Sequence, residues 1–118
     1  MGRTAFHDPR HRTRTSRHQA LGRQLPYDVA IESHGRFLRV QVKCTRFRRG
    51  RSYKCHLDSN GHPYTPDQID FIAAYVIPTD AWYILPIKAT NAQPDVLLTP
   101  NNPRSKYEKY REAWHLLV

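Results

Sequence analysis

The feature that most constrains the fold of this chain is a stretch of alternating apolar and polar residues from Tyr27 to Lys43, YDVAIESHGRFLRVQVK. Apolar side chains at every second position are typical of strands with one buried face. The dipeptide His34-Gly35 between the two arms predicts a two-residue turn. The stretch therefore predicts a β-hairpin.

The turn fixes the register of this hairpin. If Ser33 pairs with Arg36, Asp28 lies opposite Gln41 with Cβ atoms about 5 Å apart, and Lys43 lies about 7 Å away on the diagonal. A carboxylate, an amide and an ammonium group are thus predicted to converge on the polar face. The simpler alternative for this face is an ordinary solvent-facing side of a hairpin. The other face collects the apolar residues, which are Val29, Ile31, Leu38, Val40 and Val42.

The polar groups of the hairpin match the needs of phosphodiester hydrolysis assisted by Mg²⁺. A hard cation takes oxygen ligands, which Asp28, Gln41 and the backbone carbonyl of Val42 can supply. Lys43 would orient or deprotonate the attacking water and stabilise the developing charge. Because Gln41 is neutral, one further acidic ligand is expected, and Glu32 lies roughly 13 Å along the strand, too far to share an ion. The candidates are Asp58, Asp67 and Asp70.

Charge limits the partners of this chain. Its 19 Lys and Arg against 10 Asp and Glu give a net charge of +9, which favours nucleic acid first and an anionic membrane surface second. From Arg36 to Lys54 the sequence contains no acidic residue, so this segment is predicted to contact phosphates, the alternative being a solvated loop. The candidate nucleic-acid-binding residues are Arg39, Arg46, Arg48, Arg49, Arg51 and Lys54.

The sequence before the hairpin differs in composition from the rest, which suggests two regions of the chain. Residues 1–23 carry six Arg, three His and a single acidic residue, so they predict a basic, disordered arm that either grips phosphates or is merely solvated. Residues 24–118 are predicted to form the folded domain. Long apolar runs and a signal peptide are absent, which predicts a cytoplasmic protein that does not enter a membrane.

The remaining strands can be predicted from short apolar runs. Residues 52–57 predict a third strand beside the second arm of the hairpin. Residues 69–77 fit both a helix and a buried strand, and the turn at 78–80 before a clear strand at 82–87 favours strand. Residues 88–104 are rich in Asn and Pro and predict a connection.

A C-terminal amphipathic helix is predicted after this connection. Ser105 and Glu108 match a capping box, which favours a helix start. The apolar stripe that follows has helical spacing and consists of Tyr107, Tyr110, Trp114 and Leu117. Strands together with this helix predict an α+β fold.

Two cysteines are too few to stabilise a small secreted fold, so we expect reduced thiols. Cys44 continues the apolar series of the hairpin and is predicted to face the core. A zinc site of Cys44, Cys55, His56 and His62 is a weaker alternative, because their spacing matches no zinc motif. Trp82 and Tyr83 could stack on bases, but core packing is favoured for at least one of them.

The residues of the polar face also form a motif. Pro26-Tyr27-Asp28 followed by Gln41-Val42-Lys43 resembles the PD-(D/E)xK nuclease superfamily in its QxK variant. The run RVQVK, with DQIDFIAAYV and WYILPI downstream, is similar to small bacterial PD-(D/E)xK endonucleases related to group I intron homing endonucleases. The resemblance covers roughly residues 26–87 and rests on a short motif.

The resemblance implies a fold and an activity. The fold is a restriction-endonuclease-like mixed β-sheet with antiparallel hairpins, flanked by helices, over residues 24–118. The activity is Mg²⁺-dependent cleavage of DNA, with Mn²⁺ able to substitute, catalysed by Asp28, Gln41 and Lys43. RNA stays open as a substrate, and a two-fold target would suggest a homodimer or a higher oligomer.

One departure favours an alternative function. Members of this family usually begin with a helix that carries a metal-binding Glu, and residues 1–27 contain no Glu. The alternative is therefore a nucleic-acid-binding module that keeps the nuclease fold but no longer cleaves.

Overall fold

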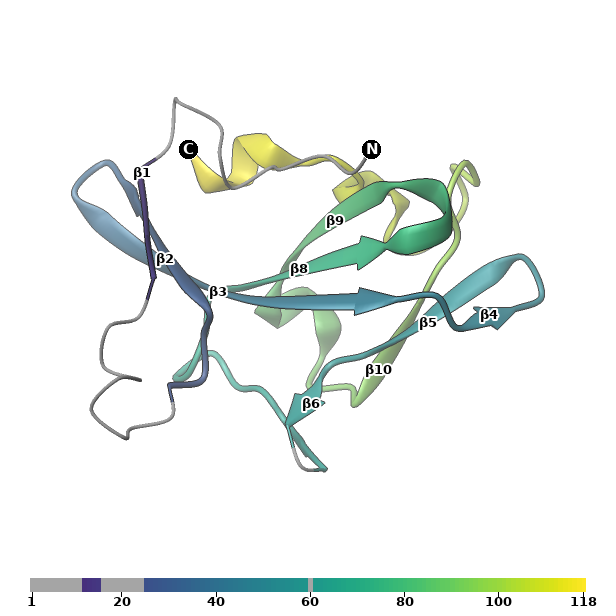
Figure 1. Ribbon diagram of the computed structural model, residues 1–118, viewed down its shortest axis with the longest axis horizontal. Helices are drawn as coiled ribbons and strands as arrows, with labels where there is room; N and C mark the ends of the chain where they lie inside the picture. The colour runs from purple at the N-terminus through teal and green to yellow at the C-terminus, as the bar shows by residue number, and fades with distance from the viewer. Residues whose placement is uncertain (1–11, 16–24, 60) are drawn as a thin grey trace.

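The larger sheet of the structure is mixed and has five strands (Figure 1). The computed structural model describes residues 12–15, 25–59 and 61–118. The strand order is β1-β2-β3-β8-β9, in which only β3 and β8 run parallel to each other. The bounds are Arg12–Thr15 for β1, Val29–Ser33 for β2, Arg36–Thr45 for β3, Phe71–Val76 for β8 and Ala81–Pro86 for β9.

The β2–β3 hairpin has the register expected from the alternating stretch. Val29 pairs with Val40, Ile31 with Leu38, and Ser33 with Arg36. The turn residues His34 and Gly35 have φ values of 51° and 80°. Two successive positive φ angles are what a two-residue hairpin turn needs, and glycine supplies one of them without strain. This prediction is confirmed.

The β8–β9 hairpin confirms the choice of strand over helix for residues 69–77. Its turn is the 3₁₀ segment η3 (Ile77–Thr79) followed by Asp80 in the left-handed region. Most side chains of the two strands are buried, because the larger sheet is covered on both faces. Continuous apolar runs without alternation are the expected pattern for such strands.

A second, smaller sheet corrects two expectations. The strand β5 (Ser52–His56) exists, but it pairs with β4 (Arg48–Arg49) and with β10 (Asp95–Leu98), and it does not pair with β3. Strand β10 lies inside the stretch expected to be a connection. These residues form a strand because Val96 and Leu98 are buried in the core. A third pairing joins β6 (Asp58–Ser59) to β7 (His62–Pro63).

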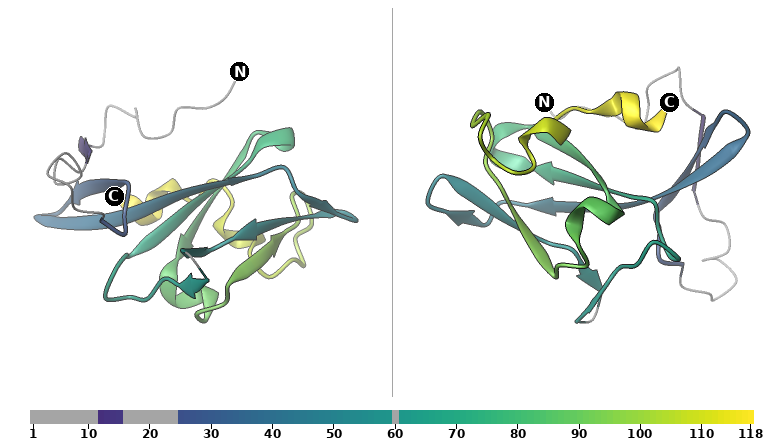
Figure 2. Two further views of the ribbon diagram at one scale, coloured as in Figure 1. Left: turned by 60° about the horizontal axis from the view of Figure 1, so that its bottom comes forward. Right: turned by 180° about the vertical axis from the view of Figure 1, so that it is seen from behind.

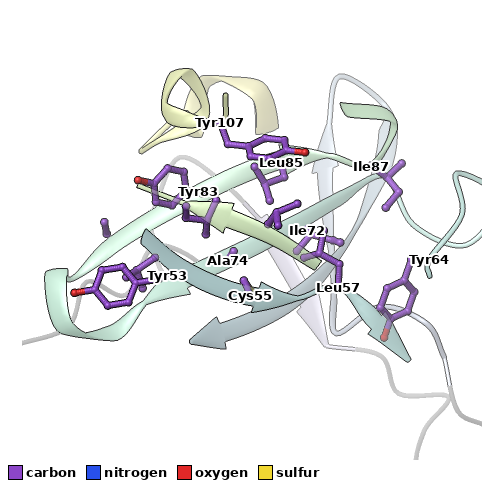
Figure 3. Packing of buried hydrophobic residues seen from close by; sticks show 14 of the residues in the cluster. Tyr53, Cys55, Leu57, Tyr64, Ile72, Ala74, Tyr83, Leu85, Ile87 and Tyr107 are labelled. Carbon is purple, nitrogen blue, oxygen red and sulfur yellow. The ribbon is translucent and has the colours of Figure 1, made fainter. Parts of the chain in front are cut away.

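The two sheets enclose the main core, and β5 and β10 lie across one face of the larger sheet (Figures 2 and 3). This core joins Cys55 and Leu57 to Ile72, Tyr83 and other residues of β8 and β9. The opposite face of the larger sheet, with Ile31 and Val40, packs against the C-terminal segment. The larger sheet is thus the middle of three layers.

The predicted C-terminal α-helix is wrong. The segment instead contains two 3₁₀ turns, η5 (Glu108–Tyr110) and η6 (Trp114–Leu117), separated by Arg111 in extended and Glu112 in left-handed conformation. Glu108 does not cap Ser105, because its carboxylate accepts hydrogen bonds from the Tyr83 hydroxyl at 2.7 Å and the Asn101 N–H at 2.9 Å.

The edge of the larger sheet explains this difference. Strand β9 lies at the edge of the larger sheet. The backbone N–H and C=O groups along such an edge have no neighbouring strand, so proteins commonly cover them with another segment. Arg111 bridges to Tyr83, and the Glu112 N–H donates to the Trp82 carbonyl at 2.7 Å. Those edge contacts require extended backbone where a helix would continue.

The helices of the described residues are all 3₁₀, so the expectation of flanking α-helices is not met there; the remaining one is η4 (Ile87–Thr90). Within that part of the chain, none is long and apolar enough to span a membrane. The basic arm of residues 1–23 lies outside the described residues, except for strand β1, which pairs with β2.

Candidate active site

Asp28 lies at the mouth of the β2–β3 hairpin, one residue before β2 begins. Its N–H donates to the Val40 carbonyl at 2.9 Å, and its carboxylate Oδ2 accepts the Val42 N–H at 2.8 Å. Strand β3 continues to Thr45, beyond Val40, which pairs with the first residue of β2. The exposed Asp28 carboxylate therefore accepts a hydrogen bond from a backbone N–H of β3 that no strand residue of β2 reaches.

Gln41 and Val42 complete this group. Gln41 is half-buried, and its Nε2 donates to the Val42 carbonyl in a long contact of 3.5 Å. Asp28 and Gln41 thus meet at the peptide groups of Val42, on the edge of β3 that β2 leaves open. A carboxylate, a side-chain amide and a backbone carbonyl are oxygen donors that suit Mg²⁺ or Mn²⁺.

Lys43 is held by two partners that the sequence did not indicate. Its Nζ donates to the Asp58 carbonyl at 3.3 Å and lies 5.4 Å from the centre of the Tyr64 ring. Asp58 is the first residue of β6, and Tyr64 directly follows β7. Tyr64 is buried, and no spacing rule in the sequence connects it to Lys43.

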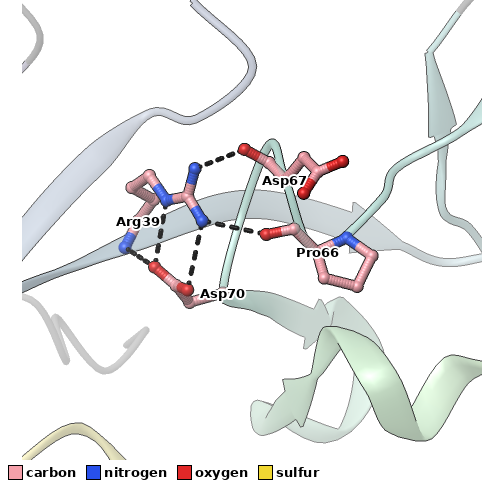
Figure 4. Close-up of polar contacts among 4 residues, drawn as sticks. All are labelled: Arg39, Pro66, Asp67 and Asp70. Atoms are coloured by element: carbon pink, nitrogen blue, oxygen red, sulfur yellow. Dashed lines mark hydrogen bonds and ion pairs between the residues drawn. The ribbon is translucent and has the colours of Figure 1, made fainter.

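Among the candidate acidic ligands, Asp70 has another role (Figure 4). Its carboxylate accepts from the Arg39 N–H at 2.8 Å, from Nε at 3.1 Å and from Nη2 at 3.2 Å. The Arg39 guanidinium also donates to the carbonyls of Asp67 and Pro66. Burial alone would raise the pKa of Asp70, but the hydrogen bonds and charge of Arg39 outweigh it and lower that pKa.

The other candidates contribute backbone atoms in this structure. Asp58 accepts from Lys43, and Asp67 from Arg39, each through its carbonyl oxygen. Within the described residues, no three His, Cys, Asp or Glu side chains gather as a metal-binding group.

The prediction that Cys44 faces the core is wrong, because Cys44 is exposed while Cys55 is buried. The apolar cluster on that face of β3 includes Val42 but does not extend to Cys44.

The predicted basic cluster divides into two groups. Arg39 is bound to Asp70, and Lys54 pairs with Asp95 at 3.6 Å, so both have partners within the chain. The arginines around the β4–β5 turn are exposed, and they are Arg46, Arg48, Arg49 and Arg51. Their contact with phosphate stays a prediction.

Trp82 and Tyr83 belong to the core and leave no ring face for bases. Trp82 is 8% exposed and packs on Tyr75 and Trp114 with ring centres 4.7 and 5.9 Å apart. Tyr83 is fully buried on the opposite face, where burial and the Glu108 hydrogen bond raise its pKa.

Comparison with solved structures gives a match to the fold. The chain is 24% identical to the chain solved as "The structure of a bacterial homing endonuclease: I-Ssp6803I", with a TM-score of 0.71 over 98% of this chain and 91% of that chain. A search of curated proteins finds no match.

Comparison with family models gives a match over nearly the whole chain. The model described as PD-(D/E)XK endonuclease matches residues 18–117. This range contains the β2–β3 hairpin, the larger sheet without β1, the smaller sheet and the C-terminal turns. The chain belongs to the PD-(D/E)XK endonuclease family.

Proposed function

We propose that this protein is a metal-dependent endonuclease that hydrolyses phosphodiester bonds in DNA. The observation that carries the proposal is the meeting of Asp28 and Gln41 at the peptide groups of Val42. Membership of an endonuclease family supports it, as does the similarity to a bacterial homing endonuclease.

The proposed roles follow from the chemistry of each group. Asp28, the Gln41 amide oxygen and the Val42 carbonyl would hold a Mg²⁺ or Mn²⁺ ion. The ion, when bound, neutralises charge on the scissile phosphate and makes a coordinated water more acidic. Lys43, which contacts the Asp58 carbonyl and the Tyr64 ring, would bring its ammonium group to the reacting phosphate and stabilise the developing charge.

A nicking assay tests the proposal. Supercoiled plasmid is incubated with the protein in Mg²⁺ and in EDTA, together with Asp28→Ala and Lys43→Ala. We expect nicking in Mg²⁺ only, and its loss in both variants. Glu32→Ala is the matched control, because Glu32 lies on β2 but is too far away to share the ion. Equal cleavage by Asp28→Ala and the parent protein would refute the assignment.

The Gln41→Glu variant separates binding from catalysis. A carboxylate in place of the amide adds a negative charge without changing the shape of the side chain, so metal affinity should rise. Asp28→Ala should lose the ion, whereas Lys43→Ala should still bind it. Mn²⁺ titration of the three variants gives the order of affinities, and an unchanged affinity in Gln41→Glu would remove Gln41 from the ligand set.

A non-cleaving DNA-binding module is the second candidate. It is favoured by one observation, which is that Asp70 has its carboxylate bound to Arg39 instead of directed to the proposed ion. If DNA is bound but not nicked in Mg²⁺ or Mn²⁺, this second function is the correct one.

A further inference from the structure

The connection between β3 and β4 carries an exposed aromatic ring among arginines. Phe47 is 57% exposed, more than the other large exposed hydrophobic residues of the described chain. It lies in the segment of residues 46–51, here called the basic hairpin, which projects from the body of the molecule at the end of β3 (Figure 1). The other side chains of this hairpin are the exposed Arg46, Arg48, Arg49 and Arg51.

The backbone around Phe47 is fixed on both sides. The Phe47 N–H donates to the Thr45 hydroxyl at 3.0 Å, and the Phe47 carbonyl accepts the Lys54 N–H at 2.8 Å. The Thr45 hydroxyl in turn donates to the Lys54 carbonyl. Arg48 Nε bonds to the Gly50 carbonyl at 2.7 Å across the tip. The ring is therefore presented by an ordered turn, which lowers the entropic cost of using it in binding.

The charge around Phe47 selects its partner. A single exposed aromatic residue needs no explanation, but four arginines in a sequence segment without Asp or Glu repel one another, and a polyanion would compensate them. Double-stranded DNA supplies regularly spaced phosphates for the arginines and stacked apolar bases beside them. Phe47 stands between Arg46 and Arg48 in the sequence, so phosphates bound by these arginines would bring bases close to its ring.

We propose that Phe47 is a wedge that enters a base step of duplex DNA while the surrounding arginines bind the flanking phosphates. Apolar side chains that insert between base pairs partly unstack them and unwind or kink the duplex. Phe47 lies roughly 13 Å along the chain from Lys43, taking strand geometry for the intervening residues, so wedge and candidate active site would contact the same stretch of DNA. This inference rests on the proposed function in requiring DNA as the partner.

Plasmid unwinding tests the wedge without any cleavage. Closed circular plasmid is relaxed in EDTA by a topoisomerase that needs no metal, in the presence of the protein, and its linking number is read on a gel after the protein is removed. We expect the parent protein to leave negative supercoils in proportion to bound protein. Phe47→Ala, compared at equal occupancy of the plasmid, should abolish this shift, and Phe47→Trp should restore it.

The matched control is Phe37→Ala, since Phe37 is 52% exposed but lies on the β2–β3 hairpin. It should leave the shift unchanged. A parent protein that binds the plasmid without changing its linking number overturns the wedge, and so does an equal shift from Phe47→Ala. Absence of DNA binding in EDTA overturns both the wedge and DNA as partner. A Phe47-dependent shift without nicking in Mg²⁺ supports the wedge and rejects only the nuclease.

Discussion

The contact between Arg39 and Asp70 is the most extensively bonded polar pair of the described residues. It ties the middle of β3 to the residue before β8, at the place where the chain returns to pair in parallel. The Asp70 N–H also donates to the Arg39 carbonyl at 2.9 Å. The pair therefore fixes the register of the parallel strands beside Gln41, which is opposite Ile72.

Stability should depend on this pair in a pH-dependent way. Because the pKa of Asp70 is lowered in the folded state, its contribution is complete above the unfolded carboxyl pKa of about 3.9 and is lost as the pH falls through the folded value. Asp70→Asn should lower the free energy of unfolding by about 1 to 2 kcal/mol at neutral pH, given the partial exposure of the pair.

Urea denaturation at neutral and acidic pH checks this prediction. The difference between the parent protein and Asp70→Asn should shrink as the pH falls below the unfolded carboxyl pKa of about 3.9 and through the lowered folded value. Asp67→Asn is the control, because Asp67 contacts Arg39 through its backbone carbonyl. A difference that stays constant with pH would assign the effect of Asp70→Asn to packing instead of charge.

At the scale of elements, the C-terminal segment covers one face of the larger sheet although it is not an α-helix. Leu117 is 2% exposed and packs with Ile31, Val40 and Ile84 in one cluster. Leu117→Ala should therefore cost about 2 to 5 kcal/mol of unfolding free energy. Trp114 is only half-buried against this cluster, so Trp114→Ala should cost less.

Thermal denaturation of these variants measures how much the C-terminal segment stabilises the larger sheet. Leu97→Ala is a suitable control, since Leu97 is 50% exposed on β10 and its removal should change stability by less than about 0.5 kcal/mol. If Leu117→Ala behaves like Leu97→Ala, the segment does not stabilise the sheet.

Local sequence patterns predicted some elements and not others. The β2–β3 hairpin was predictable because alternation and a two-residue turn leave one register. The C-terminal stripe from Tyr107 to Leu117 has helical spacing, but two 3₁₀ turns also bury Tyr107 and Leu117. The C-terminal segment contacts the edge of β9 instead of forming a helix. Which strand lies at an edge can be known only once the strand order is known.

The candidate site divides in the same way. Asp28 and Gln41 belong to one hairpin, so their proximity followed from the register. The contacts of Lys43 with Asp58 and Tyr64 depend on how residues 46–70 fold back, which no local pattern encodes. Asp70 was a candidate metal ligand but is instead the partner of Arg39. This contact could not be predicted either, because it depends on the parallel pairing of β3 with β8.

At the scale of the whole molecule, Cys55 reports on the packing of the two sheets. Its side chain is fully buried in the core between them, and this burial raises the pKa of the thiol to about 12, against a smaller opposing effect of Lys43. Cys44 is exposed. Since the thiolate is the reactive form, the two cysteines should differ strongly in reactivity.

Thiol modification at a pH of about 8 should find one fast and one slow cysteine per chain. The slow thiol should react at the rate at which the sheets separate, and both should react at once in denaturant. Cys44→Ser should remove the fast phase and Cys55→Ala the slow one. Two fast thiols in the native protein would show that the sheets open readily.

From the parallel contact of β3 with β8 we also expect an order in which the molecule assembles. Both hairpins of the larger sheet close locally, whereas β3 and β8 meet only after residues 46–70 have been ordered between them. Closing such a connection costs chain entropy before any contact compensates it, which makes it the slow step. A half-folded chain would thus hold Asp28 against Val42 while Lys43 still lacks Asp58 and Tyr64, and we expect nicking activity to return with the slow phase of refolding.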